Sequence, residues 1–156
     1  MSTGTESVLV RSMRLADLER VLEIAAGLPE APRWSRAAYL VALDALAMPR
    51  RFALAAEIAG SVTGFAVASQ IGDEAELESI AVASAFQRLG VGRQLLEALA
   101  AAVRAGGARS MLLEVRASNV RAIAFYRRLG WSECGRRPRY YADPEEDAIL
   151  FRRHFD

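Results

Sequence analysis

The residues 87–93 (Gln-Arg-Leu-Gly-Val-Gly-Arg) combine features that suit a phosphate-bearing ligand. They precede a segment with helical spacing, and a helix start offers unpaired backbone N–H groups and a partial positive charge. Gly90 and Gly92 let the backbone approach an anion closely because they have no Cβ atom. Arg88 and Arg93 add charge that suits phosphate oxygens. The segment therefore predicts a pyrophosphate-binding site at the beginning of a helix.

Two other interpretations of this segment stay open from the residues alone. An ordinary glycine-containing loop before a helix has the same pattern, because the motif is short. A dinucleotide-binding turn of the G-x-G-x-x-G type would need a third glycine, where Leu95 stands, and would lie closer to the strand end. Glu114 stands about where such a fold places its ribose-binding acid.

Other side chains with chemical potential are few. With one cysteine, Cys134, and one histidine, His154, the chain cannot build a Cys/His metal site, and we expect no metal. No Ser or Cys partner for His154 is evident, so a nucleophilic triad is not expected. Glu74, Glu76 and Glu78 alternate along one segment, which predicts a charged strand face open to solvent.

The elements that would position these residues alternate between strands and helices. The sequence predicts an α/β domain with a mixed sheet and helices on both faces. A loop is expected at Pro29 and Pro32, and a buried helix stripe at Leu95, Leu96, Leu99 and Val103. Strands are expected at 8–13, 52–58, 62–71, 74–82, 111–115, 131–137 and 148–152. Helices are expected from Asp17 to Gly27, from Ser35 to Pro49, from Gly90 or Gly92 to Gly106, and from Ser118 or Asn119 to Gly130. The apolar face of the second helix is expected to include Tyr39, Leu40 and Leu43.

Composition narrows the class of protein. The 156 residues are the size of one domain, and we expect residues 1–156 to form a single one. A net charge of +1 argues against binding to nucleic acid or to an anionic membrane. No apolar run reaches the ~18 residues of a membrane span. Residues 1–7 are polar and lack the apolar region of a secretion signal, so a cytoplasmic location is expected.

The pattern Gln-x-x-Gly-x-Gly at Gln87 resembles the acetyl-CoA motif of the GNAT acetyltransferase superfamily. Residues 76–82 (Glu-Leu-Glu-Ser-Ile-Ala-Val) are similar to the strand that leads into that motif. Residues 113–119 (Leu-Glu-Val-Arg-Ala-Ser-Asn), 122–126, 129–131, 140–141 and 146–148 are similar to the ribosomal-protein-alanine N-acetyltransferases, the RimI-like branch. The resemblance covers residues 74–151 and implies the GNAT fold, with a mostly antiparallel sheet.

The resemblance also implies roles for individual residues. Glu114 would be the general base and Tyr126 the general acid. Glu76 and Glu78 are alternative bases, because other superfamily members use an acid from this strand. Acetyl-CoA would contact Ile80, Ala81, Val82, Gln87, Arg88, Leu89, Gly90, Val91, Gly92, Arg93, Asn119 and Tyr126, and the acceptor would contact Trp34, Tyr39, Glu78, Tyr140 and Tyr141.

The implied reaction is direct transfer of acetyl from acetyl-CoA to a primary amine. The branch implies a protein N-terminal α-amine, such as the N-terminal alanine of a ribosomal protein. The alternatives are a small amine (a polyamine, an amino acid or an aminoglycoside), a non-catalytic acyl-CoA-binding module, and a nucleotide-dependent oxidoreductase. Two departures from the branch bear on the acceptor: Arg33 replaces a proline before Trp34, and residues 142–145 form a shorter loop.

Overall fold

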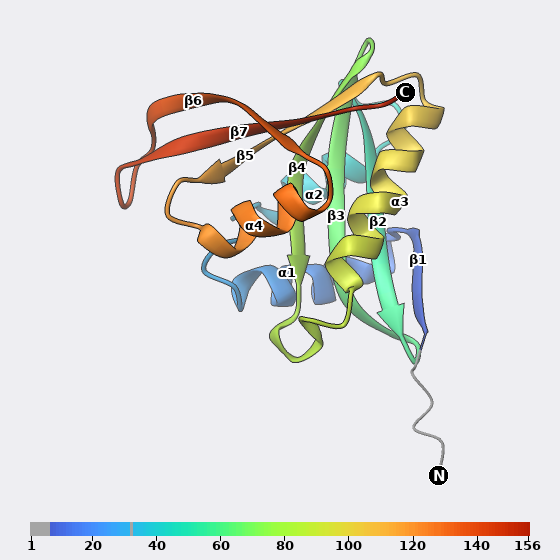
Figure 1. Ribbon diagram of the computed structural model, residues 1–156. Coiled ribbons are helices and arrows are strands. Elements are labelled where there is room, and N and C mark those ends of the chain that lie inside the picture. The colour runs from blue at the N-terminus through green and yellow to red at the C-terminus, as the bar shows by residue number, and fades with distance from the viewer. Residues whose placement is uncertain (1–6, 32) are drawn as a thin grey trace.

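A computed structural model describes residues 7–31 and 33–156, and its strands join in one sheet (Figure 1). The order across the sheet is β1-β2-β3-β4-β5-β7-β6. All neighbouring pairs are antiparallel except β4 and β5. The mixed, mostly antiparallel sheet is as expected. The strands are β1 (Val8–Ser12), β2 (Arg50–Ile58), β3 (Ser61–Ile71), β4 (Glu74–Val82), β5 (Ser110–Arg116), β6 (Ser132–Tyr141) and β7 (Glu146–His154).

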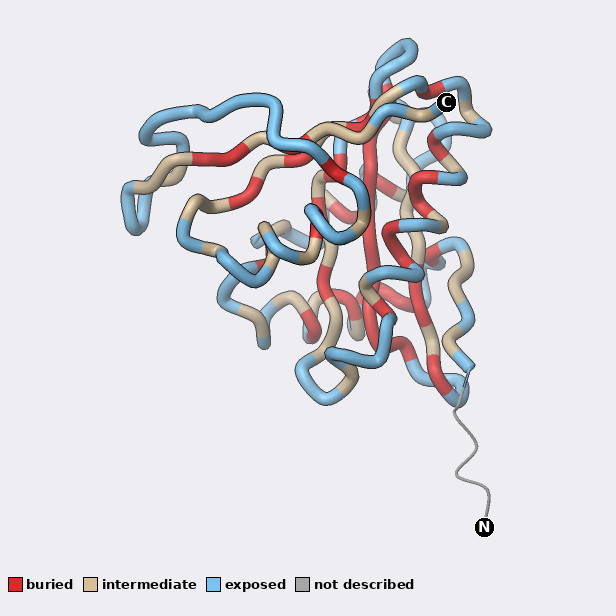
Figure 2. The backbone as a smooth tube through the Cα atoms, in the orientation of Figure 1, coloured by how far each residue is buried: buried red, intermediate tan, exposed pale blue. Residues whose placement is uncertain are grey.

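Helices cover both faces of the sheet, as the sequence predicts. Helices α1 (Leu18–Ala26) and α2 (Arg36–Leu43) lie on one face, over a core that includes Phe65. Helices α3 (Val91–Ala105) and α4 (Val120–Arg128) lie on the other, over a second core. Buried residues concentrate along β3 and the inner side of α3, whereas β6 is exposed along its length (Figure 2). The expectations for Pro32 and residues 1–6 concern parts of the chain outside the described residues.

Helix α3 follows its sequence pattern closely. Its predicted stripe of Leu95, Leu96, Leu99 and Val103 is fully buried against the sheet. Gly90 precedes the helix with φ of 81°, a left-handed conformation that glycine adopts without a Cβ clash. This conformation allows the chain to enter the helix directly after the loop at residues 87–89, so the start of α3 faces the end of β4.

Other boundaries differ from those expected. Helix α2 ends at Leu43 instead of continuing to Pro49, because Asp44 is extended and its Oδ1 accepts the amide of Leu46 at 2.9 Å. Of the expected apolar face of α2, Tyr39 is buried and Leu43 packs against the core, whereas Leu40 is exposed and Ala42 is buried in its place. The β6–β7 hairpin is longer than predicted at its tip, and two short 3-10 helices, η1 (Leu15–Asp17) and η2 (Ser84–Phe86), were not predicted.

Gly64 lies at a tight contact between β3 and β4, which gives a prediction on stability. A Cβ atom at Gly64 would lie 2.9 Å from the Ala81 carbonyl oxygen and 3.2 Å from a Leu95 methyl. We expect Gly64→Ala to lower the free energy of unfolding by about 1–3 kcal/mol in urea titrations, since a backbone atom must shift. Gly27→Ala is the control, because its Cβ atom would meet only ordinary contacts at 3.6 Å. Equal effects of the two changes would contradict the steric account.

Candidate active site

A cleft opens where β4 and β5 separate. The two strands pair only between residues 74–76 and 110–112. Beyond that point β4 stays with β3 and β5 stays with β7, so the facing edge of β4 has no strand partner among the described residues. The cleft has a volume of about 1560 Å³. It holds these predicted site residues: Glu78, Ile80, Val82, Gln87, Arg88, Gly90, Val91, Gly92, Arg93, Glu114, Asn119, Tyr126 and Tyr141.

A β-bulge at Glu78 changes which side chains of β4 face the cleft. Leu77 and Ser79 pair with consecutive residues of β3, and Glu78 is the extra residue between them. Leu77 before the bulge and both Ile80 and Val82 after it therefore face the α3 side of the sheet. Strict alternation would have turned Ile80 and Val82 to the opposite face.

The backbone of Val82 also faces the cleft. The amide of Ala83 donates to β3, at the Thr63 oxygen, over 2.8 Å. Because successive residues of a strand direct their polar groups to opposite edges, the N–H and C=O of Val82 point away from β3. The Val82 oxygen accordingly accepts the Gln87 side-chain amide at 3.1 Å, from the cleft side. A free amide donor is thus presented at the point where β4 ends.

The start of α3 presents further amide donors to the same cleft. The amide of Gln94 is bonded to the Gly90 oxygen at 3.0 Å, so the amides before Gln94 have no acceptor within the helix. Gly92 lies between Phe125 and Val82, where a Cβ atom would make ordinary contacts at 3.6 Å and 3.7 Å. Leu89 is 59% exposed and does not line the cleft, so only its backbone can serve the expected role.

Six arginines line the cleft: Arg116 pairs with Glu146, Arg33 lies in the loop before α2, and the other four lie next to or within α3 and α4. Arg88 and Arg93 were predicted, whereas Arg121 and Arg128 of α4 were missed. None of the four has an ion pair in the part of the chain that the structure describes. The spacing of Arg121 and Arg128 could have revealed them, because residues seven apart share a helix face. Asn119 caps α4 through its Oδ1, which accepts the Ala122 amide at 3.2 Å and leaves its side-chain NH₂ free for a ligand.

Glu114 and Tyr126 reach this cleft from different elements. Glu114 projects from β5, its side chain is 17% exposed, and the Arg137 Nε lies 3.5 Å from its Oε1. Tyr126 projects from α4, is 7% exposed and packs edge-on against Trp131 at 5.9 Å between ring centroids. Burial, with a smaller effect of Tyr141, raises the pKa of the Tyr126 phenol. The phenol is therefore protonated near pH 7 and can donate a proton.

Three acids of β4 lie beside Glu114 with different partners. Glu78 pairs with Arg51 at 2.9 Å and Glu74 pairs with Arg152 at 2.9 Å. Glu76 has no ion pair among the described residues. Desolvation and the nearby carboxylates of Glu114 and Glu78 raise the pKa of Glu76. Two of the three acids are thus neutralised by arginines rather than simply solvated, which the sequence did not predict.

The residues predicted to contact the acceptor amine differ in whether they are accessible at the surface. Tyr140 and Tyr141 of β6 pack edge-on at 5.1 Å, and a hydrogen bond to Glu114 raises the pKa of the Tyr140 phenol. Tyr39, in contrast, is fully buried between the half-buried Trp34 and Phe65, so it offers no surface to an acceptor. Its burial corrects the expectation of a direct contact.

Ala81 is the remaining expected cofactor residue outside the cleft. Its side chain is buried in the α1–α2 core, on the face of the sheet opposite Ile80 and Val82. The bulge at Glu78 accounts for this orientation, because it sets the alternation of the following residues. Only the backbone of Ala81 can therefore take part in ligand binding.

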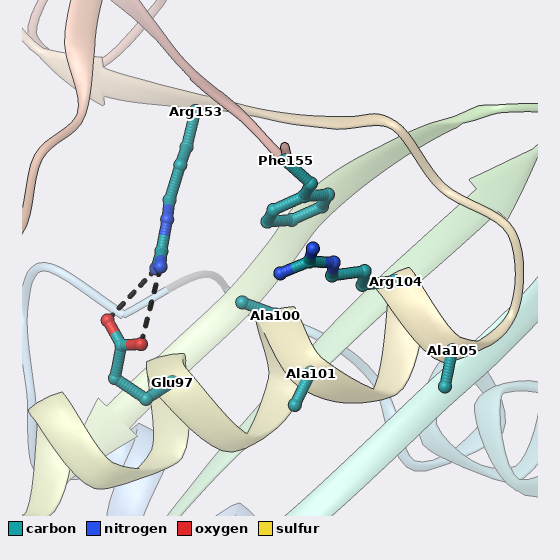
Figure 3. Close-up of a pocket in the computed structure, with 7 residues that line it drawn as sticks. All are labelled: Glu97, Ala100, Ala101, Arg104, Ala105, Arg153 and Phe155. Carbon is teal, nitrogen blue, oxygen red and sulfur yellow. Dashed lines mark hydrogen bonds and ion pairs between the residues drawn. The ribbon is translucent and has the colours of Figure 1, made fainter.

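A second, shallower hollow lies between the outer face of α3 and the end of the chain (Figure 3). Arg153 pairs there with Glu97 at 2.9 Å, beside Phe155. This hollow contains none of the residues expected to do chemistry. Two negative findings concern the described residues alone: no helix is long and apolar enough to cross a membrane, and no cluster of metal-ligating side chains occurs.

The sequence is similar to that of known acetyltransferases. Residues 18–131 match the acetyltransferase (GNAT) family. The chain is 35% identical over 159 residues to the N-alpha-acetyltransferase RimI of Mycobacterium tuberculosis, covering 98% of this chain and 96% of that protein. It is 45% identical over 93 residues to the ribosomal protein bS18-alanine N-acetyltransferase of Escherichia coli K12. That match spans 58% of this chain and only 63% of the relative's length.

Solved structures extend the similarity over nearly the whole chain. The crystal structure of the Escherichia coli ribosomal-protein-S18-alanine N-acetyltransferase superposes with a TM-score of 0.82 at 34% identity, over 94% of this chain and 92% of that one. Ard1 from Thermoplasma volcanium gives a TM-score of 0.83 at 30% identity, over 96% and 98% of the two chains. The expected GNAT fold is confirmed by these two structures.

Proposed function

Because this chain belongs to the acetyltransferase (GNAT) family, we propose that it transfers acetyl from acetyl-CoA to the α-amine of a protein N-terminus. An N-terminal alanine of a ribosomal protein is the acceptor that the similarity to the Escherichia coli enzyme supports. The observation that carries the proposal is that one cleft brings together Glu114, Tyr126 and the amides at the start of α3. We further propose that residues 1–156 act as one domain, in the cytoplasm, where ribosomal proteins are made.

The cleft residues fit acetyl-CoA as a substrate. Its pyrophosphate suits the amides at the start of α3, supported by Arg88 and Arg93. Arg121 and Arg128 add charge for the remaining phosphate. The thioester arm suits the unpaired edge of β4, whose backbone groups need hydrogen-bond partners.

Acetyl transfer then follows from the residues that meet in the cleft. Glu114 takes a proton from the acceptor amine, directly or through water, so that the nitrogen can attack the thioester carbon. The Val82 amide stabilises the charge that develops on the carbonyl oxygen. As the carbon–sulfur bond breaks, Tyr126 gives its proton to the departing thiolate. The products are the acetylated amine and coenzyme A.

A carboxylate base suits an α-amine better than a lysine. At pH 7 an α-amine is roughly 10–17% neutral, whereas a lysine is about 0.04% neutral. The difference is ~3–4 kcal/mol of deprotonation, which a single modest base does not supply easily. Two aromatic side chains of the hairpin, the exposed Tyr140 and the half-buried Tyr141, can pack against the first residues of a peptide.

The test is the initial rate of coenzyme A release from acetyl-CoA across a panel of amines. The panel contains short peptides that begin with Ala, Ser, Thr, Met or Gly, one N-blocked lysine peptide, spermidine and an aminoglycoside. We expect the highest kcat/KM for the peptide that begins with Ala. A preference for spermidine or the aminoglycoside would refute the peptide acceptor, and no release with any amine would refute the transferase activity itself.

A further inference from the structure

Strand β6 has a bulge at residues 138–140, which includes Tyr140 and directly precedes Tyr141. Arg137 pairs with Ala148 and Tyr141 pairs with Glu146, so three residues of β6 lie opposite the single residue Asp147. At the centre of this bulge Arg139 has φ of 52°, in the left-handed region that residues with a side chain rarely adopt. Such a conformation persists only where neighbouring groups hold it.

The carboxylate of Asp147 supplies the contacts that hold the bulge. Its Oδ1 accepts the backbone amide of Arg139 at 2.9 Å, and its Oδ2 accepts the Nε of Arg136 at 2.8 Å. These hydrogen bonds, the one from the Arg139 amide first, lower the pKa of Asp147. The carboxylate is therefore ionised at neutral pH and accepts both bonds at once.

The bulge determines where Tyr140 and Arg137 lie relative to Glu114, the proposed general base. Tyr140, which follows Arg139, packs on Tyr141 at 5.1 Å, and the guanidinium of Arg137 lies over its ring at 5.6 Å. Arg137, at the other end of the bulge, lies 3.5 Å from Glu114. A change in the backbone at Arg139 would thus move the groups that surround Glu114 on the acceptor side.

The preceding residue, Glu146, makes its contacts on the other side of the hairpin. Its Oε1 accepts the backbone amide of Ser118, in the loop that leads into α4, and its Oε2 lies 3.3 Å from Arg116. Ser118 and the adjacent Asn119 line the cleft. Neighbouring residues of a strand point to opposite faces, so the two consecutive carboxylates have different partners: Asp147 holds the bulge of β6, and Glu146 holds the loop at Ser118 together with Arg116, which also lies 4.3 Å from the Tyr141 ring centroid.

We propose that Asp147 is a positioning residue for the acceptor amine, whereas Glu146 positions the loop that contacts acetyl-CoA. The proposal rests on the proposed function, because it assigns each carboxylate to one of the two substrates of that reaction. Glu145 offers a matched control. It lies in the same hairpin, and among the described residues its one ion pair is with the exposed side chain of Arg139, at 3.2 Å.

The experiment compares acceptor KM and the Kd of acetyl-CoA in four variants. We expect Asp147→Ala to raise the KM of an Ala-starting peptide about tenfold and to leave the Kd of acetyl-CoA within about twofold. Asp147→Asn keeps an oxygen for the Arg139 amide, so we expect a smaller rise. Glu146→Gln should instead raise the Kd of acetyl-CoA, and Glu145→Gln should change neither. A rise in KM and Kd by the same factor in Asp147→Ala, or an equal effect of Glu145→Gln, would overturn the proposal.

Hydrogen exchange of the Arg139 amide, followed by NMR, separates this proposal from the proposed function. Asp147→Ala should speed exchange of that amide relative to wild type, while Glu145→Gln should not. If the wild-type protein acetylates no amine, the transferase activity is refuted, and this exchange still tests the role of Asp147 in the hairpin. Unchanged exchange in Asp147→Ala would overturn the proposal whatever the activity.

Discussion

Replacing Glu114 with Gln is expected to lower kcat/KM for an N-terminal peptide by about 10²–10⁴-fold. The substitution keeps the size of the side chain and removes its ability to take a proton. The Kd of acetyl-CoA should change little, because the residues proposed to bind its phosphates belong to α3, to the loop before it and to α4, and not to β5. Steady-state kinetics with a calorimetric Kd measures both quantities.

Glu76→Gln is the matched comparison for that prediction. Among the described residues, Glu76 is the one acid of this cluster without an arginine partner, and its pKa is raised by desolvation and by Glu114 and Glu78. We expect a smaller loss for Glu76→Gln, because Glu76 does not line the cleft. If Glu76→Gln lowered kcat/KM more than Glu114→Gln does, Glu76 of β4 would be the general base instead of Glu114.

Tyr126→Phe is the second change with a large expected effect. It removes only the hydroxyl group, so we expect kcat to fall by about 10²-fold or more while the KM of acetyl-CoA stays close to wild type. Tyr141→Phe, which changes a phenol that borders the same cleft, should affect the acceptor KM more than kcat. A wild-type kcat/KM in Tyr126→Phe would remove the assignment of the general acid.

The pH profile adds an independent check on Tyr126. Burial raises the pKa of Tyr126, so its phenol stays protonated, and able to donate a proton, up to a higher pH than an ordinary tyrosine. The wild-type kcat should therefore show no loss from this group below pH ~10, the ordinary value of a tyrosine. An alkaline decline of kcat well below that value, absent in Tyr126→Phe, would contradict the burial effect.

The sequence predicted helices and strands well where their bounds depend on the spacing of nearby side chains. The stripe from Leu95 to Val103 defined α3, and the bounds of β4 agree with those observed. Ser35 caps α2 as expected, with its Oγ accepting the Ala38 amide at 3.1 Å. These features depend on contacts between residues close in the chain.

Bulges, burial and ion pairs that depend on residues far apart in the chain could not be predicted from such local spacing. The bulge at Glu78 appears only when β3 is laid beside β4, and it decides that Ala81 faces away from the cleft. Tyr39 of α2 is buried because Phe65, on strand β3, packs against it. The pair of Glu78 and Arg51 likewise joins residues on strands that are not neighbours in the sheet.

Mapping the acetylated position by tandem mass spectrometry tests the central claim most directly. The substrate is one peptide that begins with Ala and carries an internal lysine, incubated with acetyl-CoA and either the wild-type protein or Glu114→Gln. The account predicts an acetyl group on the α-amine of the alanine, formed by the wild type and strongly reduced in the variant. Acetylation of the lysine instead, or equal yields from the two proteins, would contradict it.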